Sequence, residues 1–538
     1  MKHEKPLEIE NLKFRYRIRE EYALKDINLS FEAGKVTLIA GSSGCGKTTL
    51  IRCINGLIPR SYKGEFFGKI YLHGKEISNM KLAQISEIVG TVLQDPERQI
   101  LGTKVLNEVA FGLENLHYSR SEILERVEDA LNLLNITQLK DRDTFNLSGG
   151  EKQKIALAGV LAMRPSILLL DEPLASLDPA SAEEALQTFR TLADRGMTIL
   201  LVEHRVEDVL KIHPERVLFF SEGEVRYDGS AQALNASVDY REVKLPAPII
   251  IDQVRQNPIQ SRMTFPQPIK RKLDTPLVEF HNVSFYYQEG IEVLHNVTFN
   301  IYAGDRIAVL GPNGAGKTTL IKHSIGLLKP KSGQVIVQGK DTKDLSVAEI
   351  AKTLGYVFQS PSHMLFAPTV EEELSFGPRN LGHAEETIGK EVNEALEIVN
   401  LPGLQESPPL ALSFGQQKRV SIASVLAMRS KILIMDEPSA GQDYRNYIEF
   451  MDSIINLPNF ESILFITHDI DLAVIYANRV LIVNEGELKN DGTPMEVLKD
   501  FQYLRKNRLV PTSLLQTNLD YLSHTGRFAR AEELAQMI

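Results

Sequence analysis

Short apolar runs recur along the chain and are separated by glycine-containing loops and helical patterns. Residues 36–40, 167–170 and 306–310 are mostly apolar and too short to form helices, so they predict buried strands. Residues 7–14 and 28–32 instead alternate apolar with polar positions, as half-buried strands do. The pattern therefore predicts an α/β fold with a mainly parallel sheet and an antiparallel edge sheet.

Two glycine-rich loops follow buried strands and precede helical patterns, reading GSSGCGKTT and GPNGAGKTT. This is the context of a P-loop, in which glycines let backbone N–H groups close around a phosphate at a helix N-terminus. A glycine turn that binds nothing is the alternative, but the complete pattern occurs twice. We therefore predict two nucleoside triphosphate sites, formed by Gly41, Ser42, Ser43, Gly44, Cys45, Gly46, Lys47, Thr48 and Thr49, and by Gly311, Pro312, Asn313, Gly314, Ala315, Gly316, Lys317, Thr318 and Thr319.

The last residues of each loop have side chains suited to phosphate and metal. Lys47 and Lys317 can reach the β- and γ-phosphates, and the hydroxyls of Thr48 and Thr318 can hold Mg²⁺.

The P-loops belong to an internal duplication, because every later motif also occurs twice and in the same order. We predict a first domain at residues 1–240, a linker at 241–274, a second domain at 275–501 and a mainly helical tail at 502–538. The linker is dense in proline, which favours an extended coil, although an ordered strap along one domain is also open. The tail could pad the domain, dimerise or regulate.

Acidic residues close one buried strand in each half. Asp171 and Glu172 follow residues 167–170, and Asp436 and Glu437 repeat them. Ligands bind at this end of parallel strands, so the aspartates can coordinate Mg²⁺ through water and the glutamates can polarise the attacking water.

Two further polar residues end strand-like runs in each half. Gln94 and Gln359 can contact Mg²⁺ or the attacking water, and His204 and His468 can hydrogen-bond the γ-phosphate. A solvent-facing glutamine and a structural histidine are the alternatives.

Other candidates are a helix start and an aromatic residue in each half. Ser148, Gly149 and Gly150 open a helix with exposed amides, as Ser413 and Gly415 do in the second half, although helix capping alone would use the same residues. Tyr16 and Tyr287 lie near the strands that precede the P-loops. Each could stack on a nucleobase or pack on its own sheet.

Composition excludes several classes of protein. With 60 basic and 70 acidic residues the net charge is −10, so no global field attracts nucleic acid. The two cysteines make neither a disulfide framework nor a metal-ligand set, which fits a reducing cytosol. The charged N-terminus lacks an apolar signal core, and no apolar run is long enough to span a bilayer.

The ordered set of P-loop, glutamine, LSGGE, LLLDEP, SLD and histidine resembles the ATPase domains of ABC proteins over most of the chain. The resemblance implies two tandem P-loop NTPase domains, each with a helical subdomain, that bind ATP and Mg²⁺. In that family two domains pair head-to-tail, so that each ATP lies between the P-loop of one and the Ser-Gly-Gly turn of the other. It also implies a catalytic role for Glu172 and Glu437, a coupling role for Gln94 and Gln359, and adenine stacking for Tyr16.

The second half departs from the family pattern in two loops. Its signature reads LSFGQ, with Phe414 where the first half has Gly149, and residues 440–443 read AGQD where the first half has ASLD. A phenylalanine cannot take glycine-only backbone conformations cheaply. By the family's geometry both departures fall on the site that uses Lys47. We therefore expect unequal sites, with the Lys317 site the faster, although both could work alike.

The segments after each glutamine resemble the paired ATPases of energy-coupling factor importers, here fused into one chain. This resemblance implies a place at the cytoplasmic face of the cell membrane, with a membrane coupling (T) protein and a small substrate-binding membrane (S) protein as partners. The solute that fits best is a thiamine precursor, hydroxymethylpyrimidine. Alternatives are a cobalt or nickel importer of the same type, and a soluble tandem ABC ATPase acting on ribosomes or nucleic acid.

Overall fold

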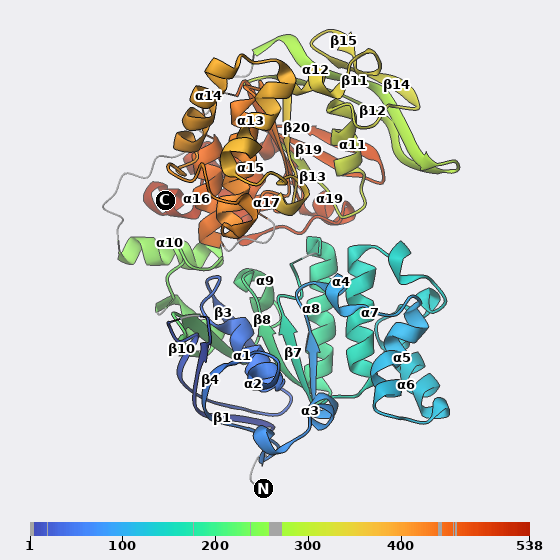
Figure 1. The fold of residues 1–538 in the computed structure, drawn as a ribbon, viewed down its shortest axis with the longest axis vertical. Coiled ribbons are helices and arrows are strands. Elements are labelled where there is room, and N and C mark those ends of the chain that lie inside the picture. Colours follow the sequence, from blue (N-terminus) through green and yellow to red (C-terminus); the bar gives the residue numbers. More distant parts are fainter. Residues whose placement is uncertain are drawn as a thin grey trace. The chain divides into compact units, whose positions relative to one another are not determined.

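The computed structural model describes residues 5–18, 20–175, 177–236, 238–257, 272–439, 444–455, 457 and 460–538. The chain folds into two compact units, one formed mainly by residues 1–253 and the other mainly by residues 254–538 (Figure 1). Each unit has a mainly parallel sheet, a separate antiparallel sheet and helices packed against them. The predicted α/β class with two copies of one architecture is confirmed.

The main sheet of the first unit has the strand order β10-β9-β3-β8-β7-β6. Strand β10 runs antiparallel to β9, and the other pairs are parallel. Strands β7 and β8 are buried along their whole length because both faces of a parallel sheet are covered. The strands are β3 (Val36–Gly41), β6 (Val89–Val92), β7 (Ile167–Asp171), β8 (Thr198–Val202), β9 (Arg216–Ser221) and β10 (Glu224–Gly229).

The antiparallel sheet of the first unit, with the order β2-β1-β4-β5, holds the P-loop helix α1 (Lys47–Ile54) from one side. One apolar core joins Leu12 and Phe14 of this sheet, Leu50 and Ile54 of α1, and Leu169 of β7. The P-loop is therefore fixed between two sheets. The strands are β1 (Leu7–Tyr16), β2 (Leu24–Phe31), β4 (Gly64–Leu72) and β5 (Lys75–Glu76).

A helical part completes the first unit, where α5 and α6 pack on α7 (Figure 1). The helices after α1 are α2 (Leu57–Arg60), α3 (Leu82–Ile88), α4 (Pro96–Gln99), α5 (Val105–Asn115), α6 (Arg120–Leu133), α7 (Gly149–Ala162), α8 (Pro179–Asp194) and α9 (Val206–Leu210).

The second unit repeats this arrangement. Its sheets have the orders β12-β11-β14-β15 and β16-β17-β18-β13-β19-β20, and β20 is again the antiparallel edge. The strands are β11 (Lys272–Gln288), β12 (Ile291–Ala303), β13 (Arg306–Leu310), β14 (Ser332–Val337), β15 (Lys340–Asp341), β16 (Leu354–Val357), β17 (Ile432–Asp436), β18 (Ser462–Thr467), β19 (Arg479–Asn484) and β20 (Glu487–Gly492). The helices are α11 (Lys317–Ser324), α12 (Val347–Ala351), α13 (Val370–Leu381), α14 (Glu385–Ile398), α15 (Phe414–Ala427), α16 (Tyr444–Ile455) and α17 (Ile470–Tyr476).

Part of the predicted linker is helical instead of extended. Helix α10 (Ala247–Gln256) buries Ile250 and Ile251, and the amide of Gln253 donates to the Val238 carbonyl over 2.8 Å. Pro248 lies in the first turn of α10, where a missing N–H removes no intrahelical hydrogen bond. Proline density therefore misled the prediction here, and the open alternative of an ordered strap describes residues 247–256 better. Residues 258–271 lie outside the described residues.

The C-terminal segment consists of short helices that pack on the second unit. Arg530 donates to Asp452 of α16 over 2.9 Å and to the Tyr476 hydroxyl of α17 over 2.8 Å. These helices are α18 (Pro494–Val497), α19 (Phe501–Lys506), α20 (Ser513–Asp520), α21 (Leu522–Thr525) and α22 (Ala531–Met537).

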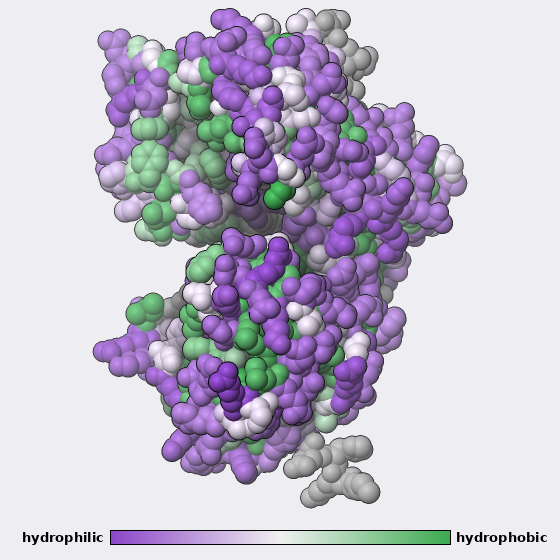
Figure 2. Space-filling model, turned by 90° about the vertical axis from the view of Figure 1, so that its right-hand side faces the viewer, coloured by the Kyte–Doolittle hydropathy of each residue, from purple (hydrophilic) through white to green (hydrophobic). Residues whose placement is uncertain are grey.

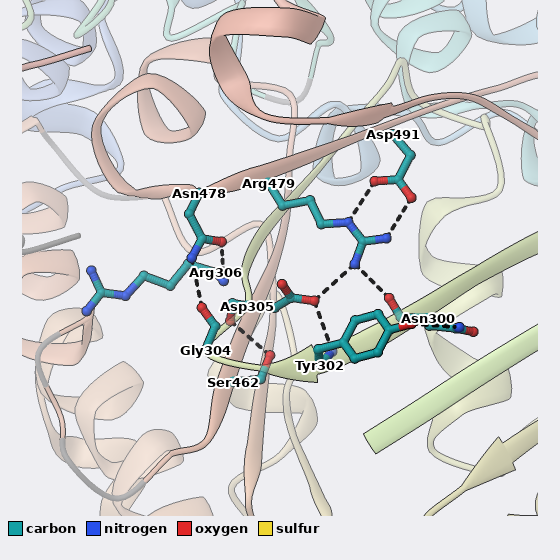
Figure 3. A network of polar contacts seen from close by, with 9 residues as sticks. All are labelled: Asn300, Tyr302, Gly304, Asp305, Arg306, Ser462, Asn478, Arg479 and Asp491. Carbon is teal, nitrogen blue, oxygen red and sulfur yellow. Dashed lines mark hydrogen bonds and ion pairs between the residues drawn. The ribbon is translucent and has the colours of Figure 1, made fainter. Parts of the chain in front are cut away.

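A buried polar network fixes the turn between β12 and β13 in the second unit (Figure 3). The carboxylate of Asp305, which is fully buried, accepts from the Arg479 guanidinium over 3.0 Å and from the Tyr302 amide over 2.9 Å. Arg479 also donates to the Asn300 carbonyl over 2.7 Å and to both oxygens of Asp491. The network therefore joins the antiparallel sheet to the strand that leads into the P-loop.

We expect Arg479→Met to lower the free energy of unfolding of the second unit by about 3–5 kcal/mol, because the buried Asp305 carboxylate would lose its guanidinium partner. The matched change in the first unit, Arg216→Met, breaks an ion pair with the half-exposed Asp228 and should cost about 1 kcal/mol. Native-state hydrogen exchange of amides in β13 and in β3 reports the two units separately. Equal losses in the two units would contradict the role given to Asp305.

Candidate nucleotide and catalytic sites

Each P-loop wraps around the ammonium group of its own lysine. Lys47 Nζ donates to the carbonyls of Gly41 and Ser42, both over 2.8 Å, and Lys317 Nζ donates to Gly311 and Pro312 over 2.8 and 2.9 Å. Both lysines are buried. A buried positive charge beside the free amides of a helix N-terminus is suited to binding an anion such as a phosphate.

Glycine at the start of each loop is required by the strand beside it. A Cβ on Gly41 would lie 2.2 Å from the Phe220 carbonyl oxygen of β9, and one on Gly311 would lie 2.0 Å from the Val483 carbonyl oxygen of β19. Both contacts are with backbone, which cannot move without disturbing the sheet. The first glycine of the motif therefore lets the loop leave its strand.

An aspartate ends strand β7 and another ends strand β17, and each lies against the P-loop of its own unit. Asp171 accepts from the Thr48 hydroxyl over 3.2 Å, and Asp436 accepts from the Thr318 hydroxyl over 3.0 Å. Burial raises the pKa of both aspartates. A hydroxyl and a carboxylate are the hard oxygen ligands that Mg²⁺ prefers, so each pair fits this ion together with phosphate oxygens.

The following glutamate in each unit leaves the sheet through an uncommon backbone conformation. Glu172 and Glu437 have φ values of 50° and 46°, in the left-handed region that non-glycine residues rarely occupy. Their amides donate to Val202 and Ile466 of the neighbouring strand over 3.0 and 2.9 Å, which holds this conformation. As a result, the aspartate and the glutamate face different partners although they are adjacent in sequence.

In the first unit both carboxylate oxygens of Glu172 accept hydrogen bonds. Gln94 Nε2 donates to one oxygen over 2.7 Å, and His204 Nε2 lies 2.9 Å from the other. The structure therefore brings together three side chains that the sequence analysis selected separately.

The second unit holds its glutamate differently. His468 Nδ1 lies 3.0 Å from Glu437 Oε1, but Oε2 is buried and has no hydrogen-bond partner among the described residues. Gln359 makes no bond to Glu437 in the described part of the chain. Burial raises the pKa of Glu437, but the charge and hydrogen bond of His468 and the charge of Lys317 outweigh it, so the pKa is lowered.

A family model described as ABC transporter matches residues 24–175 and 294–440, one segment in each unit. Similar proteins of Methanosarcina mazei and Bacillus cereus carry the provisional name ABC transporter ATP-binding protein. Each is 36% identical to this chain. The match covers 95% of this chain and 93% of the first protein, and 94% of this chain and 94% of the second. This chain belongs to the ABC transporter family. It is an ATPase and an ATP-binding subunit of such a transporter.

A solved structure titled as cbiO1 from Clostridium perfringens, part of the ABC transporter complex cbiONQ, is 36% identical to this chain. It covers 43% of this chain and 94% of its own length, with a TM-score of 0.39. Within the described residues of this ABC protein, no helix has the length and apolar character needed to cross a membrane.

The signature turns of this ABC protein cap the helices that follow them. Ser148 accepts from the Glu151 amide at the start of α7, and Ser413 accepts from the Gln416 amide at the start of α15. No hydrogen bond among the described residues joins Ser148, Gly149 or Gly150 to the P-loop of the first unit. Residues 440–443 and Ser176, from the two Asp-containing loops, lie outside the described residues.

The backbone argument about Phe414 is wrong. Gly149 and Phe414 are both the first residue of a helix, neither has a positive φ, and a Cβ on Gly149 would meet no atom within 4 Å. Phenylalanine therefore fits this position without strain inside the unit. The difference between the two units at this position is the bulk of the side chain, and Phe414 is 40% exposed.

The two tyrosines pack on their own sheets, and stacking on a nucleobase stays a prediction. Tyr16 and Tyr287 lie within 3.2 and 3.3 Å of the hydroxyls of Thr49 and Thr319 in the P-loop helices. Their rings also contact Phe14 and Phe285 edge-on. Each tyrosine is therefore anchored beside the P-loop, and the ring of Tyr287, which is 61% exposed, has room for an adenine.

Sequence reasoning missed three groups beside the carboxylates. The Tyr356 hydroxyl donates to Asp436 over 2.9 Å, and Lys418 contacts the residue after Glu437. Glu203 is buried and accepts from the Leu174 amide, and burial with the nearby charge of Glu172 raises the pKa of Glu203 to about 7. An acidic residue ending an apolar strand was a visible signal for Glu203, whereas Tyr356 and Lys418 gave no local signal.

We expect His468→Ala to make ATP hydrolysis more sensitive to acid than His204→Ala does. Without His468, the charge and the hydrogen bond that lower the pKa of Glu437 are lost while burial still raises it, so the carboxylate should take up its proton at a higher pH than in the wild type. In His204→Ala, Glu172 keeps the hydrogen bond from Gln94, so its carboxylate retains a direct partner that Glu437 lacks among the described residues in His468→Ala. Profiles of kcat against pH for the two variants and the wild type measure this. An identical acid limb in both variants would contradict it.

Proposed function

We propose that this chain is the ATPase subunit that energises an energy-coupling factor importer at the cytoplasmic face of the cell membrane. A vitamin or vitamin precursor is the solute class, with hydroxymethylpyrimidine for thiamine as the first candidate. The family membership supplies the ATPase, and the resemblance of the segments after Gln94 and Gln359 supports the importer class. The membrane partners proposed are a coupling protein and a small solute-binding protein.

The observation that carries this proposal is an exposed aromatic residue at the same place in both units. Phe111 of α5 is 44% exposed and Phe376 of α13 is 52% exposed. Leu101 and Phe366, just before these helices, are 69% and 62% exposed, and the Phe366 and Phe376 rings touch edge-on. Figure 2 shows apolar side chains interspersed among hydrophilic ones on the face of the molecule that it draws. Duplicated apolar patches of this kind suit helices of a partner protein.

In each unit the helix that carries the exposed phenylalanine, α5 or α13, closely contacts the helix that follows the signature turn, α7 or α15, which we call the signature helix. A Cβ on Gly112 of α5 would lie 2.8 Å from the Met163 sulfur after α7, and one on Gly377 of α13 would lie 2.5 Å from Met428 after α15. Glycine thus lets the patch-bearing helix approach the end of the signature helix closely. A displacement of α5 or α13 by a partner would be passed directly to that helix, since packed interiors deform little.

The proposed chemistry is ATP hydrolysis at two sites. Lys47, Lys317 and the P-loop amides would hold the phosphates, and Thr48, Asp171 and Gln94, or Thr318, Asp436 and Gln359, would hold Mg²⁺. When bound, this ion neutralises charge on the phosphates. Glu172 and Glu437 would orient and polarise the attacking water, and His204 and His468 would hold the glutamates and the γ-phosphate.

We also propose that the two glutamates contribute unequally. Both oxygens of Glu172 accept hydrogen bonds, whereas Oε2 of Glu437 has no partner among the described residues and can accept one from water. This supports the expectation that the Lys317 site is the faster.

We expect Glu437→Gln to reduce the single-turnover rate of ATP hydrolysis by about 10²–10³-fold, because a well-placed general base contributes a factor of this order. Glu172→Gln should reduce the rate by about tenfold or less. Rapid-quench measurement with the full chain and excess protein over ATP tests this. Equal losses in the two variants would refute the inequality and leave the ATPase assignment intact.

We expect the double variant Phe111→Asp, Phe376→Asp to abolish co-purification of a membrane coupling protein, because a carboxylate in an apolar interface is costly to desolvate. ATP hydrolysis by the isolated chain should change less than about twofold. Phe67→Asp is the matched control, since Phe67 is an aromatic residue that is 52% exposed on strand β4 of the antiparallel sheet. Co-purification of ribosomes or nucleic acid instead of a membrane protein would overturn the importer proposal. Uptake assays with hydroxymethylpyrimidine, cobalt and nickel then separate the solutes.

A further inference from the structure

Lys418 is a buried lysine that joins two functional segments of the second unit. It belongs to the signature helix α15, and its side chain is among the most buried of the charged residues described, with 2% exposure. Its Nζ donates to the Pro438 carbonyl over 2.8 Å. Pro438 directly follows Glu437, so the hydrogen bond reaches the turn that carries the left-handed glutamate.

A charge at this position is costly, and the unit partly compensates for it. Burial lowers the pKa of Lys418 to about 7, while the nearby carboxylate of Glu437 opposes that shift. The Phe414 ring, one helical turn earlier on α15, has its centre 5.4 Å from the ammonium group. A cation over an aromatic face is stabilised by the ring quadrupole, most strongly where water is excluded.

The first unit has a different pair of residues at these two positions. Gly149 stands in place of Phe414, and the neutral Gln153 in place of Lys418. Gln153 is also buried, but its Oε1 has no hydrogen-bond partner among the described residues. The exchange of glycine for phenylalanine in the signature therefore accompanies an exchange of glutamine for lysine, and the structure places the two new side chains in contact.

The two units thus support their glutamates from different sides. Glu172 is held at its carboxylate by Gln94 and His204. Glu437 is held at one oxygen by His468, and its backbone turn is tied to α15 by Lys418. A side chain with fewer direct partners depends more on the backbone that carries it.

We propose that Lys418 is a positioning residue for Glu437: it ties the signature helix to the Glu437–Pro438 turn and thereby fixes the direction in which the Glu437 carboxylate points. Lys418 does not touch the reacting atoms in this role. Its loss should lower the rate of hydrolysis without weakening ATP binding, since the P-loop contacts are unchanged.

The test compares Lys418→Gln with its mirror image, Gln153→Lys, in the full chain. Glutamine fits the same position of α7 in the first unit, so Lys418→Gln should fold. We expect Lys418→Gln and Lys418→Met to lower kcat by about tenfold while KM for ATP stays within about twofold and Tm does not fall, because a misplaced catalytic group costs rate more than affinity. Lys418→Arg, which keeps the charge and the donor, should recover a substantial part of the loss.

Gln153→Lys should leave kcat within about twofold of the wild type, because Glu172 keeps both of its carboxylate partners. An unchanged kcat in both Lys418→Gln and Lys418→Met would overturn the proposal. So would parallel changes of kcat, KM and Tm, which would make Lys418 a packing residue only.

Discussion

The carboxylates of each site lie where a buried parallel strand ends and the next residue has a left-handed backbone conformation. At this turn an aspartate and a glutamate that are adjacent in sequence leave the sheet in different directions, one toward the P-loop threonine and the other toward a histidine. An ordinary extended continuation would send the two side chains to opposite faces of the sheet, where one of them would be buried away from both partners. The hydrogen bond from the glutamate amide to the neighbouring strand is what keeps the turn in its costly conformation.

Much of this arrangement could be predicted from sequence because its signals are local. The P-loops combine a fixed glycine spacing with flanking apolar runs, and the Asp-Glu pair directly follows a run that can only be a buried strand. The proximity of Gln94 and His204 to Glu172 follows from the rule that parallel strands present their C-terminal ends at one edge, whereas the hydrogen bonds among them were not predicted.

Other features depend on which elements meet in space, and no local signal carries that information. Tyr356 reaches Asp436 because β16 pairs with β17, and Lys418 reaches Pro438 because α15 packs against β16, the strand beside β17. The helix α10 was missed for a different reason. Proline opposes a helix interior but is tolerated in the first turn, and a count of prolines ignores that difference. The argument about Gly149 failed similarly, since a glycine can serve close approach of a ligand without needing a glycine-only backbone.

The two units show how duplicated sites can diverge while their shared framework stays fixed. The P-loop lysines, the threonine–aspartate pairs and the tyrosine anchors have nearly the same geometry in both, because each is set by backbone carbonyls and strand ends that the sheet determines. The differences lie in the residues around this framework. Gln94, Tyr356 and Lys418 touch the carboxylates or the turn that carries them, and Phe414 contacts Lys418. Changes in these residues alter how firmly a glutamate is held but leave the phosphate cradle intact. Natural variation there can therefore tune the rates of two sites separately, while the capacity to bind ATP is preserved at both.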